Sequence, residues 1–298
     1  MQSRIIYIAG YGRSGSTMLD MMLGMHPEIF GSGEISAMCR HVWHENEFCA
    51  CGSRLRDCDV WAPVMARWTE ACDPNDHLSL QRLFEPLYAP ARTIGGRRLN
   101  AFLAQSRALF SAIRAETGRP VVLDSSKAPG RALALSRDPD VDLRVIHLVR
   151  DARAVAHAMG RAIPLDVAKG VQKKIVPRSA LRTALRWRMY NSVAEKLRTR
   201  LPAEHSVRVR YEDLMRDPLT EMMRISTAIG VDLSAIAEPI AEGAKVVPAH
   251  QMAGSRLRMK GPVALRYDDA WEVEMSNAAR KQAEMAAGAL LRRYRYIE

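Results

Sequence analysis

Four short apolar runs alternate along the chain with stretches whose apolar residues recur at helical spacing. Each run is short enough for a buried strand and is bounded by turn or charged residues. The four expected strands cover residues 4–9, 120–124, 143–149 and 206–211. The clearest expected helices cover residues 17–25, 152–161, 178–201 and 219–229. Strands separated by helices predict a three-layer α/β fold, with a mostly parallel central sheet flanked by helices.

The region between the first two expected strands has a different pattern. Residues 40–75 combine cysteines, tryptophans and turn residues and are expected to be irregular. Residues 78–116 have a mostly helical period, broken near Pro86, Pro90 and Gly95. We therefore expect a single domain over residues 1–298, carrying a cysteine-containing and helical insertion at about 36–118.

Polar residues follow every expected strand. Arg13 comes after the first, residues 124–127 after the second, Arg150 after the third and residues 211–213 after the fourth. In open parallel sheets, ligands gather at the carboxyl ends of the strands. These residues are therefore expected to meet in one crevice.

The first strand runs into a glycine-rich turn that almost spells a P-loop. The pattern G-x-x-x-x-G-K-[ST] fits from Gly10 to Gly15, but the lysine position holds Ser16, and Arg13 lies inside the loop. Backbone N–H groups and a helix N-terminus can still hold an anion, whereas binding a triphosphate requires the lysine, which contacts the β- and γ-phosphates. This favours an anionic nucleotide donor other than ATP or GTP. The expected anion-binding residues are Gly12, Arg13, Ser14, Gly15, Ser16 and Thr17.

This loop, followed by Met25-His26-Pro27-Glu28 and Gly33-Glu34, resembles the opening of the sulfotransferases that use 3′-phosphoadenosine 5′-phosphosulfate (PAPS). The likeness is greatest to the tyrosylprotein and bacterial carbohydrate-type branches. The resemblance implies an enzyme that moves a sulfonate group from PAPS to a hydroxyl of a small-molecule, carbohydrate or other acceptor. It also implies that the reaction requires no metal.

Three later segments resemble donor-binding segments of the same family. Arg150, in Leu148–Val155, matches the arginine that contacts the 3′-phosphate, and an arginine can do so with two hydrogen bonds. Tyr211 matches the tyrosine beside the adenine. The usual 3′-phosphate serine is replaced by Ala158, so His157, Arg161 or a later loop would have to compensate.

The third of these segments is a basic, glycine-containing loop near the C-terminus. It carries Arg256, Arg258 and Lys260 at alternate positions and is followed by Trp271. An extended loop would direct all three cations to one side. The resemblance implies that they close over the nucleotide.

Three residues are the candidates for catalysis. Glu34 falls on the position of the family's catalytic base, and a carboxylate can take the proton of an acceptor hydroxyl. Lys127 matches the lysine that contacts the transferring group, where an ammonium offsets developing charge. Arg13 would act in the same way from the loop.

Charge and composition limit which classes of partner the protein is expected to bind. The formal net charge of +11 indicates an anionic partner, but the 6% aromatic content argues against a nucleic-acid-binding surface. No stretch resembles a signal peptide or approaches the length of a membrane span, so a cytoplasmic location is expected. Oligomeric state cannot be inferred from the sequence.

Five cysteines are present, three of them within ten residues. Cys49, Cys51 and Cys58, with His41 and His44 just before, could bind zinc, but Cys-x-Cys is not the usual spacing of a structural zinc site. Buried thiols or a local disulfide are favoured, and no metal ligand is assigned.

The alternative function is a small-molecule kinase of P-loop type. Such an enzyme would want a loop lysine and an acidic residue for Mg²⁺, for which Asp124 is the candidate. Ser16, which stands at the lysine position, argues against a kinase. The acceptor pocket is expected in residues 36–115 and 160–180, and the acceptor itself cannot be identified.

Overall fold

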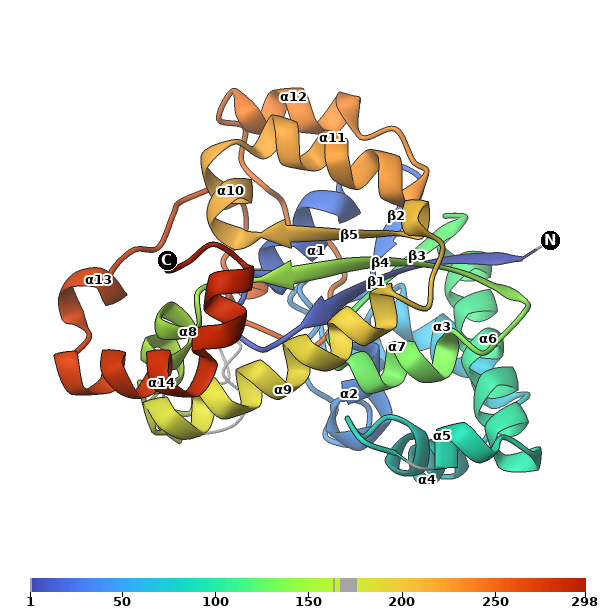
Figure 1. Ribbon diagram of the computed structural model, residues 1–298. Coiled ribbons are helices and arrows are strands. Elements are labelled where there is room, and N and C mark those ends of the chain that lie inside the picture. Colours follow the sequence, from blue (N-terminus) through green and yellow to red (C-terminus); the bar gives the residue numbers. More distant parts are fainter. Residues whose placement is uncertain (1, 90, 163, 167–175) are drawn as a thin grey trace.

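Five parallel strands form one sheet at the centre of the computed structural model, which describes residues 2–89, 91–162, 164–166 and 176–298 (Figure 1). The strand order is β2-β3-β1-β4-β5. The bounds are β1 (Ser3–Gly10), β2 (Ile29–Gly31), β3 (Val121–Lys127), β4 (Val141–Val149) and β5 (Ser206–Arg210). The four strands expected from the sequence are confirmed. The sequence prediction missed β2, because a run of three residues carries no periodic signal.

Helices cover both faces of the sheet, as the three-layer expectation requires. They are α1 (Ser16–Gly24), α2 (Ile35–Ala37), α3 (Trp61–Thr69), α4 (Pro74–Phe84), α5 (Ala91–Ile94), α6 (Arg97–Thr117), α7 (Pro129–Leu135), α8 (Ala152–Met159), α9 (Ala180–Arg198), α10 (Tyr211–Arg216), α11 (Pro218–Ile229), α12 (Ser234–Ala241), α13 (Trp271–Glu274) and α14 (Asn277–Arg293). Single helical turns also span Met38–Val42, Leu55–Asp57, Ala203–His205 and Arg256–Met259. Figure 1 shows α11 and α12 on one face and α6, α7 and α9 on the other.

The central strand β1 contributes to two hydrophobic cores. Ile6 and Ile8 pack in the cluster with α1, α11 and α12, whereas Ile5 and Tyr7 pack in the cluster with α3, α6 and α7. All four side chains are fully buried. A strand covered on both faces reads as a continuous apolar run, which is why the sequence predicted it well.

The segment between β2 and β3 corrects one expectation. Residues 40–75 were expected to be irregular, but they contain α3, whose buried residues Trp61, Val64, Met65 and Trp68 follow helical spacing. Pro63 lies in the first turn of α3, where its missing N–H is not needed. The breaks expected near Pro86 and Gly95 are confirmed, since α4, α5 and α6 are separate helices. The single-domain organisation with an insertion at 36–118 stays a prediction.

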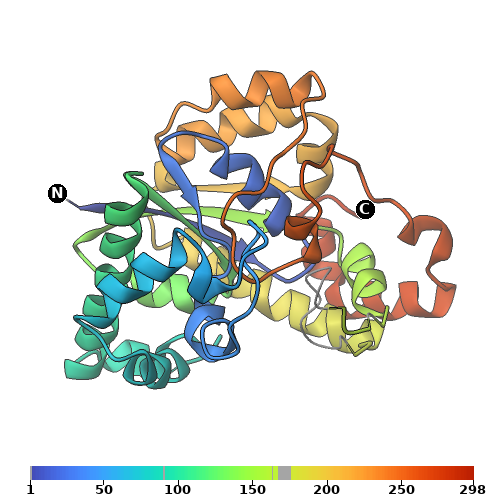
Figure 2. The ribbon, with the colours of Figure 1, turned by 180° about the vertical axis from the view of Figure 1, so that it is seen from behind.

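The segment between α12 and α13 brings the C-terminal part of the chain back to the first helix. Figure 2 shows it running alongside α1, and the backbone N–H of Ser255 donates a hydrogen bond to Thr17 Oγ1 at 3.2 Å. Gly33 and Met252 form a parallel bridge. This contact places the C-terminal loop against the carboxyl edge of the sheet. Part of the expected acceptor segment, residues 163 and 167–175, lies outside the described residues.

Candidate active site

The turn between β1 and α1 is shaped to hold an anion. Arg13 and Gly15 both have positive φ angles, 66° and 94°, which curl the chain tightly ahead of the helix. Gly15 is the N-cap residue and has no side chain to cap α1, so the first-turn N–H groups are available to a ligand. Ser14 is buried, and its Oγ has no hydrogen-bond partner among the described residues. A phosphate or sulfonate oxygen would satisfy this hydroxyl.

Tyr211, the first residue of α10, packs against this turn. A Cβ at Gly15 would lie 2.6 Å from Tyr211 Cδ2, so a larger residue would clash with the ring. The guanidinium carbon of Arg150 lies 4.4 Å from the centre of the same ring. Residues from the ends of β1, β4 and β5 therefore contact one another, as the sequence predicted for this crevice.

Arg150 links the turn to the C-terminal loop. One terminal nitrogen donates to the backbone oxygen of Arg13 at 3.3 Å, and the other donates to the Asp268 carboxylate at 3.0 Å. Its Nε is buried without a hydrogen-bond partner among the described residues. Arg150 thus keeps one unsatisfied donor, and a bound phosphate would share or replace Asp268 as its anionic partner.

Glu34 and Lys127 form an ion pair at the carboxyl edge of the sheet. Lys127 Nζ donates to Glu34 Oε1 and, at 3.3 Å, to the backbone oxygen of Ser125. Both side chains are mostly buried, with 15% of Lys127 and 23% of Glu34 exposed. Lys127 also has a φ of 67°, a conformation that non-glycine residues adopt mainly where the surroundings impose it. The sequence-predicted acid and lysine are therefore together, although 93 residues separate them.

The charges around this pair include two arginines. Burial and the positive charge of Arg256 hold the pKa of Arg13 below its usual range, while Glu34 opposes the shift. A Cβ at Gly254 would lie 3.1 Å from both Thr17 Oγ1 and Glu34 Oε1. Glu34, the start of α1 and the C-terminal loop therefore surround the same space.

A buried aspartate that the sequence analysis did not single out holds the backbone next to Glu34. Asp20, on the buried face of α1, accepts a hydrogen bond from the backbone N–H of Gly33 at 3.1 Å. The backbone N–H of Glu34 in turn donates to Met252 O at 3.0 Å. An acid within an apolar helix face was the available signal for Asp20.

The pH dependence of stability should report on Asp20. Burial raises the pKa of Asp20 from 3.8 to about 7, so ionising it opposes folding. Because the folded protein binds this proton more tightly, wild-type stability should fall as pH rises from about 4 to 7. Asp20→Asn keeps an oxygen acceptor for Gly33 and lacks this loss, so it should gain about 4 kcal/mol relative to wild type across that window. Denaturant unfolding at several pH values measures the difference. The exposed Asp269→Asn is the control, and parallel pH curves for wild type and Asp20→Asn would contradict the assignment.

The basic C-terminal loop differs from its prediction. Residues Arg256–Met259 form a single helical turn instead of an extended segment, so the three cations do not face one side. Arg258 is buried and donates to the backbone oxygen of Phe48 at 3.0 Å, whereas Arg256 and Lys260 are exposed. The positive charge of Arg256 is close enough to the P-loop-like turn to help lower the pKa of Arg13. Arg258 instead holds the cysteine-containing segment.

The groups expected to compensate for Ala158 are engaged elsewhere. His157 lies 3.2 Å from the Glu274 carboxylate, and Arg161 also pairs with Glu274. The guanidinium carbon of Arg153 lies 4.8 Å from the centre of the Trp271 ring. These contacts tie α8 to α13, so His157 and Arg161 already have an anionic partner in Glu274.

Asp124, the acidic residue that a kinase would need for Mg²⁺, is fully buried. Its carboxylate accepts hydrogen bonds from Arg131 Nε at 2.7 Å and from the backbone N–H of Ser126 at 2.9 Å. Glu85 pairs with the same arginine. An aspartate engaged in this way serves the core and is not exposed to a nucleotide-bound metal ion.

Comparison with known proteins identifies the family and the fold of this chain. The sequence matches the sulfotransferase family over residues 6–235. The sulfotransferase domain from the Synechococcus PCC 7002 olefin synthase has a similar structure, with 20% identity, a TM-score of 0.50, and coverage of 96% of this chain and 95% of that one. The sulfotransferase domain from the curacin biosynthetic pathway is 16% identical with a TM-score of 0.51, covering 97% and 98%. At these identities the two structures show a shared fold. No significant match was found among curated proteins.

The chain therefore belongs to the sulfotransferase family, and it is an enzyme of sulfonate transfer. Within the described residues, none of the helices is long and apolar enough to cross a membrane.

Proposed function

We propose that this sulfotransferase takes the sulfonate group from PAPS and transfers it to a hydroxyl of a small molecule, a carbohydrate or another acceptor. The observation that carries this proposal is the Glu34–Lys127 ion pair beside the lysine-free P-loop-like turn. The pair offers a carboxylate for the acceptor and an ammonium for the transferring group. The turn offers backbone N–H groups for the donor.

The donor would lie along the carboxyl edge of the sheet. PAPS supplies a sulfonate on a phosphate leaving group. Residues Gly12 to Thr17 would hold the 5′-phosphosulfate, with the unsatisfied Ser14 hydroxyl among the donors. Arg150 would hold the 3′-phosphate through its free Nε and a terminal nitrogen, and Tyr211 would lie beside the adenine. Arg256, Arg258 and Lys260 stay candidates for covering it, with Arg256 the best placed.

The acceptor would approach from the Glu34 side. The Glu34 carboxylate would take the proton of the acceptor hydroxyl as the oxygen attacks sulfur. Lys127, released from Glu34, would donate to oxygens of the transferring group, and Arg13 would add positive charge from the turn. No metal ion has a part in this proposed chemistry.

Donor binding tests the proposal directly. Titration of the protein with 3′-phosphoadenosine 5′-phosphate should give a Kd at least about 100-fold lower than that of ATP, and added Mg²⁺ should not change this preference. Arg150→Ala should weaken binding of this ligand by about 10- to 100-fold, since a charge-assisted hydrogen bond contributes roughly 1.5–3 kcal/mol. The same variant should alter the affinity for adenosine 5′-phosphosulfate, which lacks the 3′-phosphate, much less.

The exposed Arg67→Ala on α3 is the matched control and should bind both ligands as wild type does. A Mg²⁺-dependent preference for ATP would overturn the proposal in favour of the P-loop kinase. Equal losses for both ligands in Arg150→Ala would contradict the 3′-phosphate assignment alone.

A further inference from the structure

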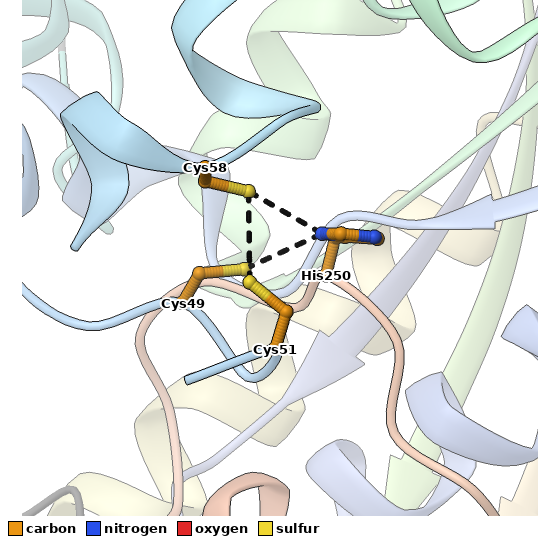
Figure 3. Close-up of side chains that lie close together, drawn as sticks. All are labelled: Cys49, Cys51, Cys58 and His250. Carbon is orange, nitrogen blue, oxygen red and sulfur yellow. Dashed lines mark hydrogen bonds between the residues drawn. The ribbon is translucent and has the colours of Figure 1, made fainter. Parts of the chain in front are cut away.

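Three cysteines and one histidine, none of them part of the Glu34–Lys127 pair, come together in a second cluster. Cys49 and Cys51 come from the segment after the turn Met38–Val42, Cys58 follows the turn Leu55–Asp57, and His250 arrives from the C-terminal loop, 192 residues after Cys58. The three sulfurs and a ring nitrogen of His250 all lie within 4.8 Å of one another. Figure 3 shows the four side chains directed toward a common centre.

Three of the distances between these atoms are close to those in a tetrahedron of metal ligands. Zinc bonds of about 2.3 Å to sulfur and about 2.0 Å to nitrogen place neighbouring ligand atoms about 3.5–3.8 Å apart. The Cys51 and Cys58 sulfurs are 3.8 Å apart, and His250 Nδ1 lies 3.3 Å from Cys58 Sγ and 3.8 Å from Cys49 Sγ. A disulfide would need a sulfur separation of about 2.05 Å. All five cysteines are free thiols.

Hydrogen bonds outside the cluster hold its two halves together. Trp61 Nε1 donates to the backbone oxygen of His250 at 2.6 Å, and the backbone N–H of Ala50 donates to Gln251 O at 3.1 Å. Arg258 binds the Phe48 carbonyl, next to Cys49. Cys49 and Cys58 are buried, while Cys51 is exposed. The ligand atoms are thus pre-arranged, with one side open for entry of an ion.

We propose that Cys49, Cys51, Cys58 and His250 form a structural zinc site. Three thiolates and a neutral imidazole are soft and borderline ligands, which suit Zn²⁺ and exclude the oxygen-seeking Mg²⁺ and Ca²⁺. Binding forms three Zn–S bonds and one Zn–N bond, and the thiol protons pass to solvent. Because the protein supplies all four ligands, no coordination position remains for a substrate. The ion has no part in the sulfonate transfer.

The site joins the inserted segment to the loop that borders the candidate active site. Two residues beyond His250, Met252 accepts the hydrogen bond from the Glu34 backbone and donates one to Ser32 O at 3.1 Å. Gly254 follows, where a Cβ would lie 3.1 Å from side-chain oxygens of both Thr17 and Glu34, and the backbone N–H of Ser255 donates to Thr17 Oγ1. A zinc ion at His250 therefore anchors the start of this loop and restrains the backbone of Glu34.

Metal analysis of the full-length chain, purified with reductant and with any metal-binding tag removed, tests the site. We expect about one zinc ion per chain, and a thermal midpoint lowered by about 10 °C or more after removal by a chelator. Cobalt exchange should give thiolate-to-metal charge-transfer absorption and the strong d–d bands of tetrahedral cobalt. Cys58→Ser and His250→Ala should weaken zinc affinity by at least about 100-fold, since loss of an outer partner alone costs 10–100-fold. The controls Cys39→Ser and Cys72→Ser change cysteines outside the cluster and should keep the ion.

Failure of the reduced wild-type chain to bind zinc or cobalt would overturn the proposal, and so would a disulfide among Cys49, Cys51 and Cys58. The cobalt spectrum of wild type decides the matter even where a variant does not fold. None of these readouts depends on PAPS, so the zinc site and the proposed donor can fail separately.

Discussion

Glu34→Gln is expected to lower kcat by about 10²–10⁴-fold, the usual contribution of a general base. Glutamine preserves the shape of the side chain and can still accept a hydrogen bond from Lys127 through its amide oxygen. It cannot take the proton of an acceptor hydroxyl. The affinity for 3′-phosphoadenosine 5′-phosphate should stay nearly unchanged, because Glu34 acts on the acceptor. Initial rates with a hydroxyl acceptor found by screening, together with a calorimetric titration of the nucleotide, measure the two effects.

Glu28→Gln is the matched control for this change. Glu28 is an exposed carboxylate on the segment that precedes β2, so the variant should retain full turnover. Near-normal turnover in Glu34→Gln would show that another group takes the proton. A large loss of nucleotide affinity would instead place Glu34 in the donor site.

Lys127→Met is expected to lower kcat by about 10²–10³-fold, the cost of losing one donor to charge that develops in the transition state. Methionine keeps the length of the aliphatic stem and removes the ammonium. Since this interaction strengthens as negative charge moves onto the leaving phosphate, kcat should fall much more than affinity for the desulfated nucleotide. The same rate assay and titration separate these quantities.

The exposed Lys281→Met on α14 controls for loss of a positive charge and should behave as wild type. A Lys127→Met enzyme with normal kcat and weak nucleotide binding would make Lys127 an anchor for the ground state. Thermal unfolding of both variants checks that the substitution does not lower the stability of the fold.

Much of the fold was predictable because its signals are local. Central parallel strands are buried on both faces, so β1 appears as a continuous apolar run from Ile5 to Ala9. Helix α11 starts at Pro218 and ends before Gly230, and these two residues are local sequence signals for a helix start and a helix end. Gly230 has a φ of 66°, which favours glycine. Other elements were missed, among them α7, α12 and α14 as well as β2 and α3. Strand β2 is too short for a periodic signal, and the cysteines and turn residues around α3 obscured its helical period.

The candidate site was predictable as a set of residues and not as a set of contacts. Motif order along the chain picked out Arg13, Glu34, Lys127, Arg150 and Tyr211, and the structure brings them to one edge of the sheet. Their roles stay predictions until the variants above are measured. The basic loop was misjudged because alternation predicts a common side only for an extended chain. The helical turn at Arg256–Met259 buries Arg258 instead.

The sequence by itself determined the alternating architecture, the lysine-free P-loop-like turn and the family, because each depends on residues that are close along the chain. Only the tertiary structure decided which distant residues become partners. It paired Lys127 with Glu34, sequestered Asp124 with Arg131, and brought His250 to Cys49, Cys51 and Cys58. The histidines next to those cysteines in sequence suggested other ligands. The residue that the structure places beside the cysteines is instead His250, from the C-terminal loop. Contacts between distant segments depend on how the sheet and helices pack, and they leave no periodic pattern in the sequence.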